Sequence, residues 1–182
     1  DRAEFERFRR MVTASLFREH FEKAPDPIRA SLLVQYRMHP QIMNLVNHFY
    51  EHRLSNGIPD PDSSRAHGCT LSSGGRPYVL PNQHAIWIDS SKDPLGQPAM
   101  EVQEGSSKVN ELEAILVAKV LADLNSTLKQ EGYGPRNRKA VGVISFYGRQ
   151  VRRIRRQIAN WERMFGPFDA LRTSVSTVDM YQ

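Results

Sequence analysis

Apolar residues form short, nearly continuous runs at four places in the chain, and these runs predict strands. They are ASLLVQY at 30–36, AIWIDS at 85–90, AVGVISFY at 140–147 and TSVSTVDMY at 173–181. A short run rich in apolar and β-branched residues is typical of a strand that is buried on both faces. The pattern therefore predicts an internal sheet that is covered on two sides.

Between these runs, apolar residues recur at helical spacing. After Pro40, which suits a first helical turn, the spacing i, i+3, i+4 and i+7 is filled by Ile42, Leu45, Val46 and Phe49. Similar spacing predicts helices over 1–24, 40–52, 107–131 and 148–164. From 55 to 84 the chain is rich in Gly, Pro, Ser and Asp, which predicts a long irregular segment with one edge strand near 77–80.

Strands that alternate with helices predict an α/β layered fold with a mostly parallel sheet. In such a sheet the polar groups that follow each strand gather at the carboxyl edge. We therefore expect three clusters to lie along one rim: 35–39, 145–147 and 179–182. The first of them belongs to QYRMHP at 35–40, which places hydrogen-bonding and stacking groups directly after an apolar run.

Composition and charge indicate the kind of partner and the compartment. The net charge is +5, the pI is near 9.6, and most of the basic residues are arginine, whose guanidinium suits phosphate. A polyanionic partner is favoured, although many proteins of this charge bind none. The single cysteine, Cys69, excludes internal disulfides and favours a reducing intracellular compartment, cytoplasmic or nuclear. The absence of a long apolar run and of a signal-peptide pattern predicts a soluble protein that does not enter a membrane.

Four blocks of sequence resemble one known family. LLVQYRMHPQIMNLVNHFYEHRL at 32–54 is similar to the nucleotide-contacting motif of superfamily 1 helicases, in the branch of the nonsense-mediated-decay helicase and senataxin. Blocks similar to that family then follow in the family's order: SKVNELEA at 107–114, VGVISFYGRQV at 141–151 and VSTVDMYQ at 175–182. Upstream, SLFREHF at 15–21 resembles a helix of the same proteins. Ordered blocks of this kind are more specific than a lone glycine-rich match.

The resemblance implies a three-layer RecA-like fold of the P-loop NTPase type. Residues 1–26 would be a helical lead-in from a preceding motor domain, and 27–182 a second RecA-like helicase domain that is truncated at its C-terminal end. The start at Asp1 and the stop at Gln182, directly after a strand-like stretch, also suggest a piece of a longer protein. By this resemblance the parent would be an ATP-dependent helicase that moves 5′ to 3′ along single-stranded DNA or RNA.

The resemblance also implies roles for QYRMHP. ATP would lie in a cleft between this domain and the first RecA-like domain of the same chain, with Mg²⁺ held by ligands in that first domain. Arg37 is the candidate sensor of the γ-phosphate, because a guanidinium is planar, permanently charged and able to bridge two phosphate oxygens. Tyr36 would stack on the adenine. Gln35, beside them in the nucleotide site, and His39 are expected to hold the loop in shape, with Asn110 and Glu113 helping from the long helix.

The strand tips provide candidates for a nucleic-acid path. Hydroxyl groups can bond to successive phosphates and an aromatic ring can stack on a base, so we expect little sequence preference and a strong dependence on salt. The candidates are Ser145, Phe146, Tyr147, Ser176 and Thr177. By contrast, the arginine stripe formed by Arg149, Arg152, Arg153 and Arg156 is interpreted first as the solvated face of an amphipathic helix.

The chain also departs from the family. Ser145-Phe146-Tyr147 stands where Thr-Pro-Tyr is usual, and Met180 and Tyr181 replace a small residue and a phenylalanine. The sequence has no G-x-x-x-x-G-K-[ST] loop and no acidic magnesium-binding strand, so the fragment alone is expected to be inactive.

Two other functions remain open from the residues. A degenerate RecA-like module could bind nucleic acid or protein as a scaffold without ATPase activity. A metal hydrolase is the weaker alternative, because His48, Glu51 and His52 spell a reversed zinc-protease pattern but lack an evident third ligand. No metal site is therefore predicted.

Overall fold

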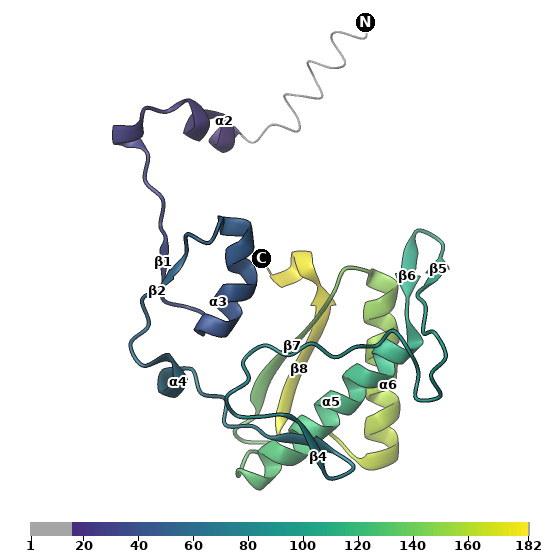
Figure 1. Ribbon diagram of the computed structural model, residues 1–182. Coiled ribbons are helices and arrows are strands. Elements are labelled where there is room, and N and C mark those ends of the chain that lie inside the picture. The colour runs from purple at the N-terminus through teal and green to yellow at the C-terminus, as the bar shows by residue number, and fades with distance from the viewer. Residues whose placement is uncertain (1–15, 182) are drawn as a thin grey trace, which may run out of the picture.

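The computed structural model describes residues 16–181 and shows a mixed α/β chain (Figure 1). Its helices are α2 (Leu16–Lys23), α3 (Pro40–Asn47), α4 (Pro61–Ser64), α5 (Glu111–Gln130) and α6 (Gly148–Phe165). Its strands are β1 (Val34–Gln35), β2 (Ser55–Asn56), β3 (Leu71–Ser73), β4 (Arg76–Val79), β5 (Val102–Glu104), β6 (Ser107–Val109), β7 (Lys139–Ser145) and β8 (Leu171–Thr177). Three short 3-10 helices, η1 (Asp26–Ile28), η2 (His48–Tyr50) and η3 (Val178–Tyr181), complete the described part. The predicted helix over 1–24 is present from Leu16; residues 1–15 lie outside the described part.

The main layer consists of β7 and β8 with α5 and α6 over one face. The two strands are parallel and in register from Lys139 opposite Leu171 to Ser145 opposite Thr177. Along β7, Val141 and Val143 are half-buried, whereas Ile144 is 54% exposed. Figure 1 shows both helices on the same side of this pair. The described residues thus cover one face of the strands, not both as predicted.

Two apolar clusters join the helices to this strand pair. One contains Leu121 and Leu128 of α5 with Leu171 of β8, and the other contains Val151 and Ile154 of α6 with Ala114 and Val175. The β3–β4 hairpin packs against the first cluster, to which it contributes Leu71 and Val79. The edge strand predicted near 77–80 is therefore confirmed as β4, and the helices predicted over 107–131 and 148–164 as α5 and α6.

The first two predicted strands differ from what is observed. Of 30–36, Val34 and Gln35 alone form a strand, which pairs in parallel with β2, and Leu32 is 95% exposed. The segment 85–90 forms no strand, and Trp87 is 92% exposed. Both runs have the composition of buried strands, but within 16–181 β2 pairs with only two residues of the first run and no strand pairs with the second. A run of apolar residues records a tendency to be buried, and it becomes a strand only where a partner backbone is present.

The predicted single rim is also wrong for the described residues. Strands pair here as four separate two-stranded sheets, and β1 is not hydrogen-bonded to the β7–β8 pair. The predicted strand over 173–181 ends at Thr177 and turns into η3, which contains Asp179. The α/β class with parallel pairing is nevertheless confirmed by β1–β2 and β7–β8. Among the described helices, none combines the length and the apolar character that crossing a bilayer requires.

Candidate functional site

Gln35 fixes the backbone of the QYRMHP loop. Its side-chain Oε1 accepts hydrogen bonds from the backbone N–H of Arg37 (2.9 Å) and of Met38 (2.7 Å), and its Nε2 donates to the carbonyl of Met38 (2.8 Å). A side-chain amide that satisfies three backbone groups replaces the hydrogen bonds that β1 would otherwise continue. Gln35 therefore shapes this loop, as the sequence predicted.

His39 forms the start of α3. Its ring is 5% exposed, and its Nδ1 accepts a hydrogen bond from the backbone N–H of Gln41 at 3.2 Å. An N–H group can only donate, so the ring proton belongs on Nε2, which donates to Asp62 Oδ1 at 3.0 Å. The ring thus serves as a helix cap, with Pro40 as the first helical residue. The loop-shaping role predicted for His39 is confirmed.

The irregular segment 55–84 encloses this loop. Arg65 donates from Nη2 to the carbonyl of Tyr36 (3.0 Å) and from Nε to the carbonyl of Arg37 (3.1 Å). The N–H of Gly57 bonds to the carbonyl of Gln35 at 2.9 Å. A Cβ on Gly57 would lie 2.4 Å from Tyr36 Cε1 and 2.7 Å from Val34 Cγ1, so glycine is required for this close approach. The segment therefore holds the loop backbone through hydrogen bonds, and Gly57 leaves room for the tyrosine ring beside it.

A cluster of three histidine rings lies at the end of segment 55–84. His84 stacks on His39 with ring centroids 3.5 Å apart, and His67 meets His84 edge-on at 5.1 Å. Burial, together with repulsion from His39 and His67, lowers the pKa of His84 below its ordinary value of 6.5, while Asp62 acts against this shift. The side chain of Gln41 ties down the neighbouring backbone, because it donates to the carbonyl of Asn82 and accepts from the N–H of His84, both at 2.8 Å.

The geometry of this cluster opposes a metal ion. One ligand atom each of His39, Asp62 and His84 lies within 4.8 Å of the others. Both ring nitrogens of His39 are already engaged, however, because Nε2 bonds to Asp62 and Nδ1 accepts from the N–H of Gln41. The alternative at His48 and His52 fails for another reason. The α-helix ends at Asn47, and the two rings meet edge-on with centroids 5.8 Å apart, but among the described residues no third metal-ligating side chain joins them.

Arg37 and Tyr36 are held by their backbones and present their side chains outward. Tyr36 is 65% exposed, and Arg37 is also exposed. Within the described residues, the guanidinium of Arg37 makes no hydrogen bond or ion pair with the protein. A fixed backbone with a free guanidinium suits a group that binds a phosphate from outside the domain.

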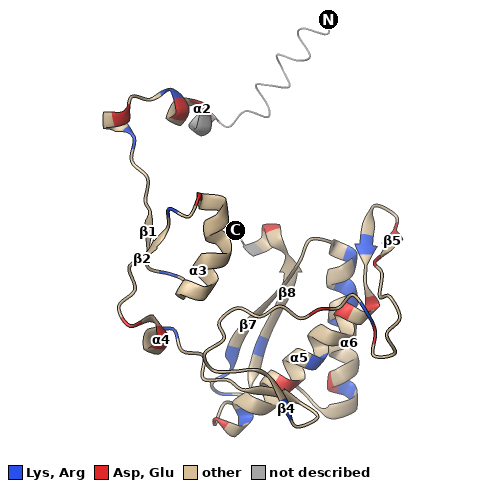
Figure 2. Ribbon diagram, in the orientation of Figure 1, with Lys and Arg blue, Asp and Glu red and all other residues tan. Residues whose placement is uncertain are grey.

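The tip of β7 forms a second part of the site. Phe146 is 83% exposed, and the N–H of Tyr147 bonds to Ser145 Oγ at 3.3 Å. These side chains line a hollow of about 210 Å³ together with Asn110 and Gln150. In Figure 2 several positions along α6, which begins at this tip, are coloured as basic residues.

The hydroxyl candidates do not all share one face. Ser145 lies opposite Thr177 in the register, and both continue the helix-covered face of the strand pair. Ser176 lies opposite Ile144 and belongs to the other face. The structure therefore brings Ser145, Phe146, Tyr147 and Thr177 together at one end and separates Ser176 from them. It also leaves this group on a different sheet from QYRMHP.

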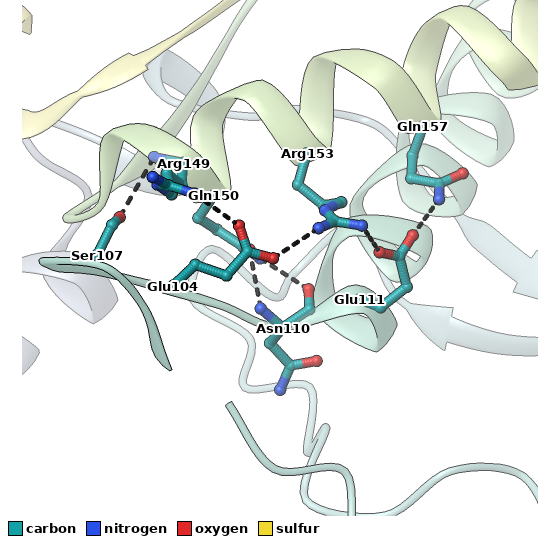
Figure 3. A network of polar contacts seen from close by, with 8 residues as sticks. All are labelled: Glu104, Ser107, Asn110, Glu111, Arg149, Gln150, Arg153 and Gln157. Atoms are coloured by element: carbon teal, nitrogen blue, oxygen red, sulfur yellow. Dashed lines mark hydrogen bonds and ion pairs between the residues drawn. The ribbon is translucent and has the colours of Figure 1, made fainter. Parts of the chain in front are cut away.

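Asn110 has a different role from the predicted one. Its Oδ1 accepts from the N–H of Glu113 at 3.1 Å, which caps α5, and its Nδ2 donates to the carbonyl of Ala99. Its backbone N–H and carbonyl both bond to the side-chain amide of Gln150 at 2.9 Å (Figure 3). Asn110 and Gln150 are both buried. The prediction that Asn110 and Glu113 hold the QYRMHP loop is thus wrong, because Asn110 joins α5 to α6 and the N–H of Glu113 belongs to the cap of α5.

Sequence reasoning missed Gly57, Asp62 and Arg65. These residues lie in a stretch rich in turn-forming residues, and nothing in their spacing distinguishes them from ordinary loop residues. The one available signal was the long irregular segment itself, because such segments in compact domains are often functional.

Two comparisons with known proteins complete the description of the site. The family model AAA_12, described as an AAA domain, matches residues 12–182, which is nearly the whole chain. The match indicates a helicase-type domain. Together with the α/β fold and its parallel strand pairs, it identifies the fold as RecA-like. A search of curated proteins gave no match.

Proposed function

The chain belongs to the AAA_12 family of AAA domains, and from this premise we propose that it is the second motor domain of a superfamily 1 helicase in the branch of the nonsense-mediated-decay helicase and senataxin. The helicase would use ATP to move along single-stranded DNA or RNA, 5′ to 3′ as the resemblance implies. Its first RecA-like domain would be the partner across the nucleotide cleft.

One observation supports this function above the others: the exposed guanidinium of Arg37 on a fixed loop. Gln35, His39 and Arg65 hold the backbone through hydrogen bonds, so the loop keeps its shape while the guanidinium faces outward. A preorganised cation of this kind loses little entropy when a phosphate reaches it.

ATP fits the side chains at this loop. Arg37 would contact the γ-phosphate and Tyr36 would stack on the base, with Gln35 keeping the two residues in place. Bound Mg²⁺ would neutralise phosphate charge, and its ligands are expected in the first motor domain. When the cleft closes, Arg37 would stabilise the negative charge that develops on the transferred group.

Substitution of Arg37 in the full-length protein tests this function. We expect Arg37→Ala to lower the nucleic-acid-stimulated ATPase rate by about a thousandfold, because an arginine of this type stabilises the transition state. Arg37→Lys should recover only part of the rate, since an ammonium lacks the planar fork. Initial rates at saturating oligonucleotide measure both effects.

The matched control is Arg53→Ala, which removes another exposed arginine from the same part of the chain. Arg53 pairs with Glu51 at 3.3 Å, and among the described residues its guanidinium makes no hydrogen bond or ion pair with the QYRMHP loop. Its variant should keep the parental rate. An Arg37→Ala protein as active as this control would eliminate the sensor role and favour a scaffold without a motor.

A further inference from the structure

The arginine stripe of α6 surrounds a hollow that the proposed motor function does not explain. Arg149, Arg152, Arg153 and Arg156 line a space of about 200 Å³, and Glu104 is the one carboxylate that lines it with them. Guanidinium groups in such numbers around a single acid create a positive field that attracts anions.

Two of these arginines are held in place by carboxylates. Glu104 bonds to Arg149 Nη1 at 3.3 Å and to Arg153 Nη2 at 2.9 Å, and Arg153 Nη1 also bonds to Glu111 at 2.8 Å (Figure 3). Gln157 supports Glu111 from the next turn. The β5–β6 hairpin and α5 therefore position one side of the hollow.

The other two arginines have no such partner. Arg152 and Arg156 are exposed, and neither makes a hydrogen bond or ion pair with any other residue of the described part. They are one helical turn apart, a rise of about 6 Å, where like charges destabilise a helix by about 0.2–0.5 kcal/mol. Four arginines face two carboxylates here, so two positive charges lack a counterpart.

We propose that this hollow binds backbone phosphates of single-stranded nucleic acid. This inference rests on the proposed function and extends the path beyond the tip of β7. Residues at the start of α6 line both hollows, because Tyr147 and Gln150 line one and Arg149 lines the other. A strand that stacks a base on exposed Phe146 would run directly onto Arg149, Arg152 and Arg156.

The neighbourhood favours nucleic acid over other polyanions. An exposed aromatic ring beside a basic track is the usual combination for single strands, because the ring stacks on a base while the cations follow the backbone. An acidic peptide would gain from the cations but not from the stacking surface. The fork geometry of the two free guanidiniums suits phosphate oxygens.

The experiment compares two double variants of the full-length protein. Arg152→Gln with Arg156→Gln removes the unpaired cations, and Arg163→Gln with Arg138→Gln removes the same charge from exposed positions outside the hollow. Affinity for a fluorescent single-stranded oligonucleotide is measured over a range of salt. Loss of two phosphate contacts should reduce the salt slope by about 1.4 and weaken binding about twenty-fold at 0.1 M salt.

Each outcome has a distinct meaning. If the parent protein binds no oligonucleotide at all, the proposed function fails. If the parent binds the oligonucleotide and the two double variants bind it with equal affinity, the nucleic-acid path is elsewhere and this inference is overturned. If the variant with Arg152→Gln and Arg156→Gln loses binding to a polyglutamate peptide but keeps its affinity for the oligonucleotide, the hollow binds an acidic protein partner. That result would also overturn this inference. Equal melting temperatures would confirm that the substitutions leave the fold intact, and Arg152→Lys with Arg156→Lys should restore most of the affinity.

Discussion

At the scale of single residues, the QYRMHP loop depends on contacts that no motif contains. Arg37 and Tyr36 occupy the places that the resemblance assigns to phosphate and base, but Gly57 and Arg65 determine how these residues are presented. Because its residue types are characteristic, the sequence alone is enough to predict phosphate and base contacts for this loop. The contacts of Gly57 and Arg65 could not be predicted, because they bring together residues more than twenty positions apart within an irregular segment.

Gly57→Ala should disturb nucleotide binding more than stability. The added Cβ would lie 2.5 Å from Tyr36 Cζ and 2.7 Å from Val34 Cγ1. The tyrosine ring is the exposed end of a side chain and can move, so the cost to folding should be about 1 kcal/mol, at the low end for overpacking. We expect a raised KM for ATP with a much smaller change in kcat, measured by steady-state ATPase assays.

Gly134→Ala provides the control for this substitution. No atom lies within 4 Å of a Cβ at that position. The variant should match the parent in both KM and melting temperature. A Gly57→Ala protein with parental KM would show that the position of the Tyr36 ring does not affect nucleotide binding.

His84 should make stability depend on pH. Its pKa is lowered in the folded state by burial and by His39 and His67, so the unfolded chain binds this proton more readily. The stabilising contribution is therefore complete above about pH 6.5 and is lost as pH falls through the folded pKa. Titration of the His84 ring proton by NMR should give a midpoint below 6.5, and urea unfolding of His84→Gln should depend less on pH. A midpoint at or above 6.5 would contradict the stacked arrangement.

At the scale of elements, the sequence predicted the helices well and half of the strands poorly. α5 and α6 follow their apolar spacing because their hydrogen bonds are internal, so the pattern and the caps are sufficient. β7 and β8 were also predicted correctly, since each provides the other with a partner. The runs at 30–36 and 85–90 are also mostly apolar, yet within 16–181 the first forms a strand of two residues and the second forms none. A strand requires a second backbone, which a local pattern does not provide.

At the scale of the whole molecule, the two parts of the candidate site lie in regions that differ in how many apolar side chains are buried. The tip of β7 belongs to the region in which both apolar clusters lie. The QYRMHP loop lies on β1, β2 and α3, and neither cluster includes a described side chain from these elements. Buried residues there are few, with Met43, Asn47 and Ile58 among them, while Leu45 and Phe49 remain 64% and 84% exposed. Side-chain hydrogen bonds hold this region instead of a core.

This difference should be visible in hydrogen exchange. Amides of α3 should open with a lower free energy than those of α5 between Leu121 and Leu128, because local stability follows buried apolar contact. A nonhydrolysable ATP analogue should then slow exchange in 34–47 far more than in α5, since the ligand binds only the ordered loop. Exchange followed by mass spectrometry on the full-length protein measures both effects, with Arg37→Ala as the variant in which the ligand-induced protection is lost. If α3 exchanged as slowly as α5 without nucleotide, the lower local stability expected for this region would be contradicted.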